Sequence, residues 1–188
     1  KSYIAQSAWA SVAPLIVAKN ALNGGAGTQA AGIVIGGSLP AVTAVTEEFD
    51  GTNWAAGGSL NTARSSGASA KGGSQTAALS ISGYNGTADV AIVESYDGTT
   101  WTEVGDVNTA RRGHGGAGTT AAALAFGGPG NVTHTEEFDG SSWTETADLN
   151  TGRASIGGGG CGIQTAALCA GGHGGAGSSG GGHDEVEE

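Results

Sequence analysis

Residues Thr87–Arg111 read TADVAIVESYDGTTWTEVGDVNTAR, and this stretch decides the fold. Apolar and polar residues alternate over Asp89–Tyr96, which predicts a β-strand. Asp97-Gly98 then predicts a tight hairpin turn, because Gly tolerates a positive φ and Asp caps the turn through its own side chain. A second strand is expected over Trp101–Val107, and the stretch ends at a basic residue, Arg111.

The same skeleton, an aromatic residue, Asp-Gly, a Trp and an Arg ten residues after the Trp, occurs three times along the chain. The three copies are Phe49-Asp50-Gly51 with Trp54 and Arg64, Tyr96-Asp97-Gly98 with Trp101 and Arg111, and Phe138-Asp139-Gly140 with Trp143 and Arg153. A degenerate copy keeps Ile4, Trp9 and Lys19 at the same offsets. The four tryptophans are 45, 47 and 42 residues apart. Repetition at such a period indicates a solenoid, a propeller or an array.

Each repeat is interpreted as four short strands, and the second repeat shows them most clearly. There we expect strands at Ser65–Lys71, Thr76–Ser82, Asp89–Tyr96 and Trp101–Val107. The matching second strands are Gly32–Gly37, Ala122–Gly128 and Ala166–Gly172, and the matching third strands are Val42–Phe49 and Val132–Phe138. No long segment has the apolar period of a helix, so the chain is predicted to be all-β. A four-stranded antiparallel unit repeated at this length is a propeller blade, since one sheet cannot bury both of its faces alone.

We therefore predict one domain, residues 1–188, folded as a small propeller of four four-stranded antiparallel blades. The blades are assigned to residues 20–64, 65–111, 112–153 and 154–188. Asp184–Glu188 resembles a third strand, and Tyr3–Trp9 resembles a fourth strand without its third. The segment 1–19 is thus expected to complete the last blade and close the ring. The alternative is that the chain is a fragment of a longer array. The Gly-, Ala- and Ser-rich first strands suit a crowded axis.

Composition narrows the classes of partner. The chain has 188 residues, a net charge of −10 and only seven Lys and Arg, which argues against binding a nucleic-acid backbone. No run of 18 apolar residues is present, so no transmembrane helix is expected, and the opening KSYIAQ does not read as a signal peptide. Cys161 and Cys169 are interpreted as free thiols, with a disulfide as the alternative.

The repeat resembles the kelch repeat. The resemblance rests on the di-glycines Gly36-Gly37, Gly127-Gly128 and Gly171-Gly172, on the aromatic residue followed by Asp, on the later Trp, and on the basic residue after the fourth strand. It covers nearly the whole chain. Kelch propellers usually have six or seven blades, and the blades here are more alike and poorer in large residues, with 38 Gly in all. The sequence pattern TEEFDG-x-x-W…LNTAR is similar to glycine-rich repeats of phage and bacterial proteins, which are often tail fibres or secreted adhesins.

The repeated residues are interpreted first as structural markers. Trp9, Trp54, Trp101 and Trp143, with Phe49, Tyr96 and Phe138, are expected to pack between blades, with a stacking platform for sugars as the alternative. Arg64, Arg111 and Arg153 are expected to bridge blades, because a planar guanidinium offers five donors; a ligand-binding ring of arginines is the alternative. One Glu of each pair at 47–48, 136–137 and 187–188 is expected to meet such an Arg. A Ca²⁺ site from these carboxylates lacks the spacing of a calcium loop.

Signals for catalysis are weak. The chain has no G-x-S-x-G elbow and no phosphate loop, and no Ser, His and Asp are spaced as a unit. The kelch family includes a copper oxidase, but its Tyr, Cys and His constellation has no counterpart here. His173 and His183, near Asp184 and Glu185, are residue types that can bind a metal ion, but the Gly/Ser run between them favours a solvated loop. We therefore expect no catalytic residue, no metal and no cofactor.

The loops between second and third strands differ in length and composition while the strands hardly change. They are Ser38–Ala41, Tyr84–Ala88, Pro129–Asn131 and His173–Gly182, and the binding candidates on them are Tyr84, Asn85, Asn131, His173 and His183. We expect a non-enzymatic structural or interaction protein, extracellular or on a virion, such as a phage tail-fibre protein or a secreted adhesin. Its expected partner is a protein or a surface glycan, with homo-oligomerisation or virion assembly left open. A lectin-like module and a sugar-active enzyme are the alternatives.

Overall fold

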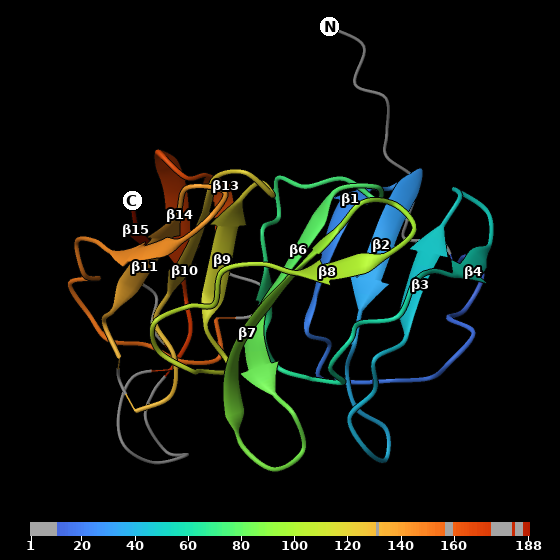
Figure 1. Cartoon of the computed structure of the whole chain (residues 1–188), viewed down its shortest axis with the longest axis horizontal. Coiled ribbons are helices and arrows are strands. Elements are labelled where there is room, and N and C mark those ends of the chain that lie inside the picture. Colours follow the sequence, from blue (N-terminus) through green and yellow to red (C-terminus); the bar gives the residue numbers. More distant parts are fainter. Residues whose placement is uncertain (1–10, 131, 157–159, 174–181, 183–185) are drawn as a thin grey trace, which may run out of the picture.

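The computed structural model describes residues 11–130, 132–156, 160–173, 182 and 186–188, and within them the chain is built of β-strands. Four antiparallel sheets are arranged as the blades of a four-bladed propeller (Figure 1), which confirms the predicted all-β class and architecture. The described part of the chain contains no helix that could cross a membrane.

Each blade is a sheet whose strands follow one another in chain order. Blade 1 holds β1 Gly24–Thr28, β2 Ala31–Ile35, β3 Thr46–Phe49 and β4 Trp54–Ala56. Blade 2 holds β5 Ala68–Ser69, β6 Ala78–Tyr84, β7 Asp89–Tyr96 and β8 Trp101–Glu103. Blade 3 holds β9 Gly115–Gly118, β10 Ala123–Phe126, β11 Thr135–Phe138 and β12 Trp143–Glu145. Blade 4 has three strands in the described residues, β13 Gly160–Ile163, β14 Ala166–Ala170 and β15 Val186–Glu187.

The registers show that the blades repeat residue for residue. Gly32 pairs with Phe49 in blade 1, Ala78 pairs with Tyr96 in blade 2, and Ala123 pairs with Phe138 in blade 3. The strands are shorter than the alternation of residues predicts. The fourth strand of blade 2 ends at Glu103 instead of Val107, although the N–H groups of Val104 and Val107 still donate to the carbonyl oxygens of Val93 and Ala91 in β7. The third strand of blade 1 begins at Thr46 instead of Val42.

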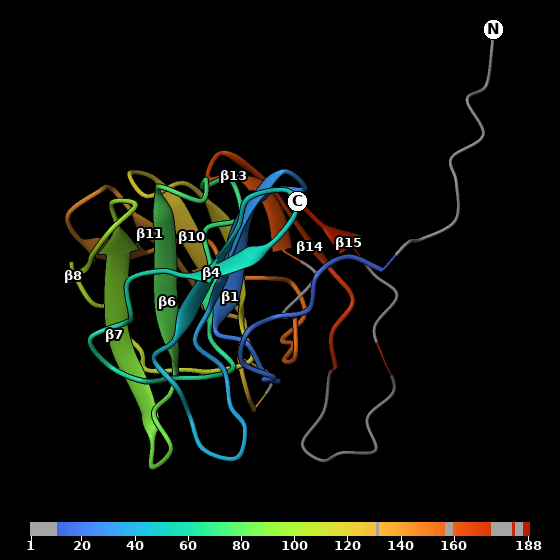
Figure 2. The ribbon, with the colours of Figure 1, turned by 90° about the vertical axis from the view of Figure 1, so that its right-hand side faces the viewer.

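The segment 1–19 is predicted to close the ring, and its first ten residues, which include the expected strand Tyr3–Trp9, lie outside the described residues. The next residues, Ser11–Lys19, are described, and they lie against blade 1 (Figure 2). There the indole Nε1 of Trp54 donates to the carbonyl oxygen of Ala13 at 3.1 Å.

Small residues line the axis because the inner strands approach too closely for side chains. A Cβ added to Gly24 of β1 would lie 2.6 Å from the Cβ of Ser69 in β5. A Cβ on Gly116 of β9 would lie 2.6 Å from the carbonyl oxygen of Ser69, and one on Gly160 of β13 would lie 2.7 Å from that of Gly116. The high glycine content of the first strands is thus required by their close packing.

The core lies between blades instead of within them. Ile33 and Ile35 of blade 1 pack with Ala78, Tyr96 and Trp101 of blade 2. Leu79, Ile81 and Val93 of blade 2 pack with Ala123, Phe138 and Trp143 of blade 3 in the same way. The third cluster joins blades 3 and 4 and holds Ala117, Phe126, Ile156 and Cys169. Both cysteines are free thiols, Cys161 exposed and Cys169 buried.

Candidate functional site

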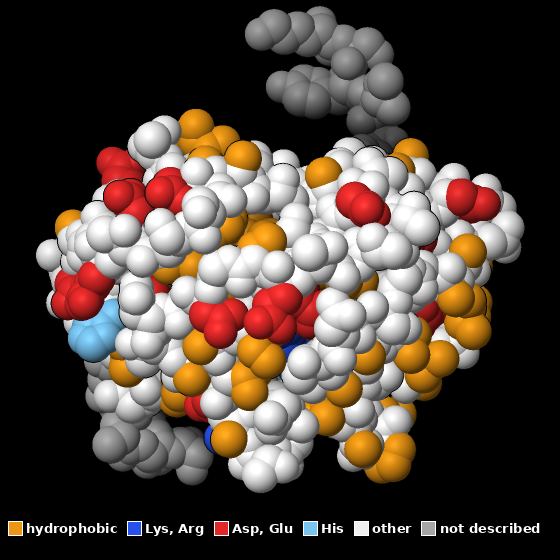
Figure 3. Space-filling view, in the orientation of Figure 1, with side chains coloured by type: hydrophobic (Ala, Val, Ile, Leu, Met, Phe, Trp, Pro, Cys, Tyr) orange, Lys and Arg blue, Asp and Glu red, His pale blue; other side chains and the backbone are white. Residues whose placement is uncertain are grey.

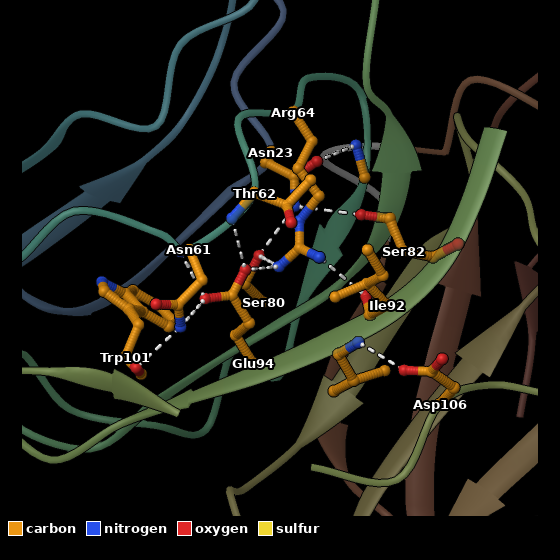
Figure 4. Close-up of polar contacts among 12 residues, drawn as sticks. Asn23, Asn61, Thr62, Arg64, Ser80, Ser82, Ile92, Glu94, Trp101 and Asp106 are labelled. Carbon is orange, nitrogen blue, oxygen red and sulfur yellow. Dashed lines mark hydrogen bonds and ion pairs between the residues drawn. The ribbon is translucent and has the colours of Figure 1, made fainter. Parts of the chain in front are cut away.

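A buried carboxylate holds each blade to the segment that leaves the preceding blade. Glu94 of β7 accepts hydrogen bonds from the backbone N–H groups of Asn61 and Thr62 at 2.7 and 3.3 Å. It also forms an ion pair with Arg64 at 3.1 Å, and both side chains are fully buried. Figure 4 shows the Asn61 amide and the Arg64 guanidinium directed at the same carboxylate. Asn61 and Arg64 lie on the segment that follows β4 of blade 1, whereas Glu94 belongs to blade 2. The contact therefore joins two blades.

The same contact recurs around the propeller. Glu136 of β11 accepts hydrogen bonds from the backbone N–H groups of Asn108 and Thr109 and pairs with Arg111, and these three residues follow the fourth strand of blade 2. Glu187 of β15 accepts from the N–H of Asn150 and pairs with Arg153, which follow the fourth strand of blade 3. Glu47 of β3 receives the backbone N–H groups of Ile16 and Val17 at 2.6 and 3.3 Å and the Lys19 ammonium at 3.2 Å. The first Glu of each predicted pair therefore meets the repeat cation, as expected.

These ion pairs shift pKa values in directions that follow from burial and partners. Burial lowers the pKa of Arg64, although the negative charge of Glu94 opposes the shift. Burial would raise the pKa of Glu187, but the backbone N–H of Asn150 and the charge of Arg153 outweigh it, and the pKa is lowered. Because the side chains of Arg64, Arg111 and Arg153 are at most 3% exposed, they offer no surface to a ligand.

The aromatic markers contact one another in pairs across each hairpin, stacked in blades 2 and 3 and tilted in blade 1. Phe49 and Trp54, Tyr96 and Trp101, and Phe138 and Trp143 have ring centroids 5.0, 4.8 and 5.0 Å apart. The Trp101 indole also donates from Nε1 to the carbonyl oxygen of Gly58, which belongs to the preceding blade, at 2.9 Å. Trp101 and Trp143 are only 5 and 6% exposed, so their faces are not available for stacking on a sugar. Trp9 lies outside the described residues.

The hairpin aspartates cap their own turns. Asp97 accepts hydrogen bonds from the backbone N–H groups of Thr99 and Thr100, both at 2.8 Å. Asp50 and Asp139 make the equivalent pair of contacts. Hydrogen bonds from the backbone N–H groups lower the pKa of all three exposed carboxyls, because they favour the charged form.

The variable loops that join β2 to β3, β6 to β7 and β10 to β11 lie at one end of the propeller, which we call the loop end. In Figure 1 the connections β2–β3, β6–β7 and β10–β11 are at the bottom of the view. Backbone bridges tie three of the loops to the entry of their own blade: Asn20 with Ser38, Ser65 with Tyr84, and Ala154 with His173. These bridges anchor one end of each of the three loops to the entry of its blade.

A cavity of about 400 Å³ opens at this end, and all four blades contribute to it; we call it the axial mouth. It is lined by Ala21, Leu22, Ser66, Gly67, Arg112, Gly113, Pro129, Ala154 and Ser155. Four equivalent residues of this lining, Ala21, Ser66, Gly113 and Ser155, have φ values of 45, 57, 62 and 56°. Backbone hydrogen bonds connect neighbouring blades here, from Ser66 N–H to Ala21 at 2.9 Å and from Gly113 N–H to Ser66 at 2.6 Å. The mouth is thus framed by strained but bonded backbone.

Arg112 is the charged group of the axial mouth. Its side chain is 46% exposed, which distinguishes it from the other three arginines. The guanidinium carbon lies 4.5 Å from the centroid of the Tyr84 ring, and its Nε lies 3.4 Å from a carboxylate oxygen of Asp89. The Tyr84 ring and Asp89 thus hold a solvent-facing cation at the edge of the mouth.

The predicted binding residues are placed unevenly. Tyr84 lies beside the mouth, half-buried, with its hydroxyl donating to the carbonyl oxygen of Gly86 at 2.9 Å. Asn85 caps its own loop by accepting from Thr87 and Ala88 N–H, both at 2.9 Å. His173 is exposed and bridges Ala154 through its backbone. Asn131 and His183 lie outside the described residues.

Sequence reasoning missed Arg112. A signal existed, because the repeat demands one basic residue after the fourth strand and blade 2 supplies two in a row, Arg111-Arg112. Only Arg111 pairs with the buried carboxylate of the next blade, Glu136, and Arg112 lies at the surface.

In the part of the chain that the structure describes, no three His, Cys, Asp or Glu side chains gather in a way that could hold a metal ion. The chain matches no model of a known protein family, and no curated protein sequence matches it.

Proposed function

We propose that this chain is a non-enzymatic interaction propeller that presents its loop end to a partner. The observation that carries the proposal is spatial: the variable loops and the axial mouth share one end, while the seams and hairpins repeat almost unchanged. A rigid scaffold carrying variable loops is the usual arrangement of a recognition module. Together with the resemblance to kelch repeats and to phage and bacterial repeat proteins, this supports a role on a phage tail, a virion or a secreted adhesin.

A surface glycan is the second candidate partner, and Arg112 favours an acidic one. An exposed guanidinium beside an aromatic ring can pair with a sugar carboxylate. The rest of the molecule is strongly acidic, and in Figure 3 acidic side chains are spread over the visible face while Lys and Arg show at only small spots. An anionic ligand would therefore be repelled over most of the surface, and the exposed guanidinium of Arg112 is the group of the mouth that would pair with it.

Binding of labelled protein to an array of immobilised acidic and neutral glycans, and to intact bacterial cells, tests the proposal. We expect binding to at least one of these surfaces, reduced about tenfold or more by R112A. The matched control is Q29A, an exposed residue at the opposite end, between β1 and β2. If Q29A loses binding while R112A keeps it, the recognition face lies at the end opposite the loop end, and the proposal is wrong. Binding to none of the surfaces would also count against it.

A further inference from the structure

The loop between β6 and β7 is built as the same turn as the three Asp-Gly hairpins, with Asn85 in the place of the Asp. Oδ1 of Asn85 accepts from the N–H groups of Thr87 and Ala88, both at 2.9 Å, and Oδ1 of Asp97 accepts from the N–H groups two and three residues on at 2.8 Å. The backbone N–H of Asn85 donates to the carbonyl oxygen of Ala88 at 3.0 Å, and the equivalent bond of Asp97 is 3.3 Å long. The glycines that follow have φ values of 96 and 95°. The loop therefore surrounds a neutral amide with the groups that surround a carboxylate in the hairpins.

In the hairpins, these two donors stabilise a negative charge on Oδ1. Hydrogen bonds from the backbone are the largest cause of the lowered pKa of Asp50, Asp97 and Asp139, although all three carboxyls are exposed. At Asn85 the same donors point at an oxygen that carries no charge. A reaction that develops negative charge on this oxygen is therefore favoured, because donors already in place stabilise the charge as it forms.

Gly86 supplies a nucleophile beside this amide. The residue is exposed and has no side chain to shield its backbone nitrogen. Its carbonyl oxygen accepts the hydrogen bond from the Tyr84 hydroxyl at 2.9 Å, but within the described residues its N–H donates to no acceptor. Solvent base can therefore remove the proton from the Gly86 nitrogen.

We propose that Asn85 is a site of spontaneous deamidation. The deprotonated nitrogen of Gly86 forms a bond to Cγ of Asn85, and the electron pair of the carbonyl bond moves to Oδ1, where the N–H groups of Thr87 and Ala88 stabilise it. Nδ2 takes a proton from water and leaves as ammonia when the Cγ–Nδ2 bond breaks, and a cyclic imide remains. Water then adds to one of the two imide carbonyls and breaks its bond to the Gly86 nitrogen. The product is aspartate or isoaspartate, in which the chain runs through Cγ; one water is consumed and one ammonia is released.

The chain offers an internal control, because Asn23-Gly24 has the same two residue types in a buried place. Asn23 is fully buried, its Nδ2 donates to Oγ of Ser80 at 2.8 Å, and its Oδ1 accepts from the N–H of Gly67 at 2.9 Å. Gly24 packs so closely that an added Cβ would lie 2.6 Å from the Cβ of Ser69. Solvent base does not reach this pair in the folded chain. The hairpin aspartates are protected for another reason, because an ionised carboxylate is a poor electrophile.

The reaction changes the charge of the loop end. Arg112 lies over the Tyr84 ring and pairs with one carboxylate, that of Asp89. Deamidation adds a second carboxylate to this loop, next to Tyr84, and one further negative charge takes the formal net charge from −10 to −11. The inference goes beyond the proposed function, because it concerns a covalent change of the loop and holds whether or not the axial mouth binds a ligand.

Incubation of the folded chain in mildly alkaline buffer made with heavy-oxygen water tests the proposal. Each event incorporates one heavy oxygen atom, and fragmentation of the digested chain by mass spectrometry locates it. We expect Asn85 to convert at least about tenfold faster than Asn23, because Asn23 reacts only after its blade opens. In urea, where both pairs are exposed, the two rates should be similar. The rate at Asn85 in the folded chain should lie within about tenfold of its rate in urea, or above it.

Three results would overturn the proposal. Slower conversion of Asn85 in the folded chain than this limit would mean that the turn protects the amide. Equal rates at Asn23 and Asn85 in the folded chain would mean that conversion follows unfolding. The third concerns N85D, which carries the product from the start. It should elute from an ion-exchange column with the acidic form that accumulates in the incubated parent, and it should melt at or above the parent's temperature. A clearly lower melting temperature would show that the turn does not accept a carboxylate.

Discussion

Glu136→Gln tests whether the buried carboxylates hold the blades together. Glu136 is 1% exposed and accepts from Asn108 N and Nδ2 at 2.6 and 2.9 Å, from Thr109 N at 3.3 Å, and from Arg111. A Gln of the same shape keeps one oxygen but turns an NH₂ group toward these donors and leaves the Arg111 charge without its counter-ion. Removing one partner of a buried ion pair costs about 3–5 kcal/mol. Arg111 keeps two carbonyl partners, Gly127 and His134, so we expect about 3 kcal/mol.

Glu137→Gln is the matched control, since it removes the same charge one residue away on the exposed face of β11. Urea unfolding followed by tryptophan fluorescence measures both variants. With an m-value of about 2 kcal/mol per M, E136Q should lower the midpoint by about 1.5 M, and E137Q should leave it nearly unchanged. A loss below about 1 kcal/mol for E136Q, or equal losses for both variants, would show that the carboxylate contact does not hold the seam.

Three further predictions concern single buried groups. Burial, aided by the charge of Arg111, lowers the pKa of His114 from 6.5 to about 3. In the unfolded chain His114 therefore binds a proton that it does not bind in the folded chain. The free energy of unfolding should fall as the pH drops from about 6.5 toward 3, by about 2 kcal/mol at pH 5. In urea titrations at several pH values, H114N should reduce this dependence on pH. W101F should cost about 1 kcal/mol more than W143F by thermal unfolding, because Trp101 Nε1 has an acceptor whereas the buried Nε1 of Trp143 has no partner among the described residues; equal costs would contradict this. G118A should cost about 1–3 kcal/mol more than G130A, since both have positive φ but only the Cβ at 118 would meet a carbonyl, that of Ala122 at 2.2 Å; similar melting temperatures would refute the steric argument.

The sequence allowed the hairpins and the order of strands to be predicted, because those depend on residues close in the chain. Asp97-Gly98 encodes its own turn, and the spacing to Trp101 sets the pairing with Tyr96. Where the fourth strand ends could not be predicted in the same way. The alternation of residues continues to Val107, but the N–H of Asn108 binds the carboxylate of Glu136 in the next blade. That contact is tertiary, so the residue pattern carries no mark of it.

The candidate site was only partly predictable. The described variable loops lie at the same end as the axial mouth, and Tyr84 lies beside the mouth. The mouth itself is framed by Ala21, Ser66 and Ser155 at positive φ, which residue type does not signal, since Ala and Ser rarely adopt that region. The conformation is imposed by hydrogen bonds between blades, such as that from Ser66 to Ala21. Arg112 could not be singled out from the sequence, because the repeat requires one basic residue after the fourth strand and Arg111 already meets that requirement.

The seam contact also bears on how such a protein can change through its gene. At Glu94 and Glu136, the junction joins the Asn and Arg that follow one tryptophan to the Glu that precedes the next tryptophan, so each half of the junction lies in a different repeat. An in-frame duplication of one repeat would therefore carry a complete pair of halves, and the added blade would meet both neighbours with contacts they already make. Near-identical repeats also favour unequal recombination. Blade number is then a quantity that copy-number change can raise or lower in one step, without a single new interface having to evolve.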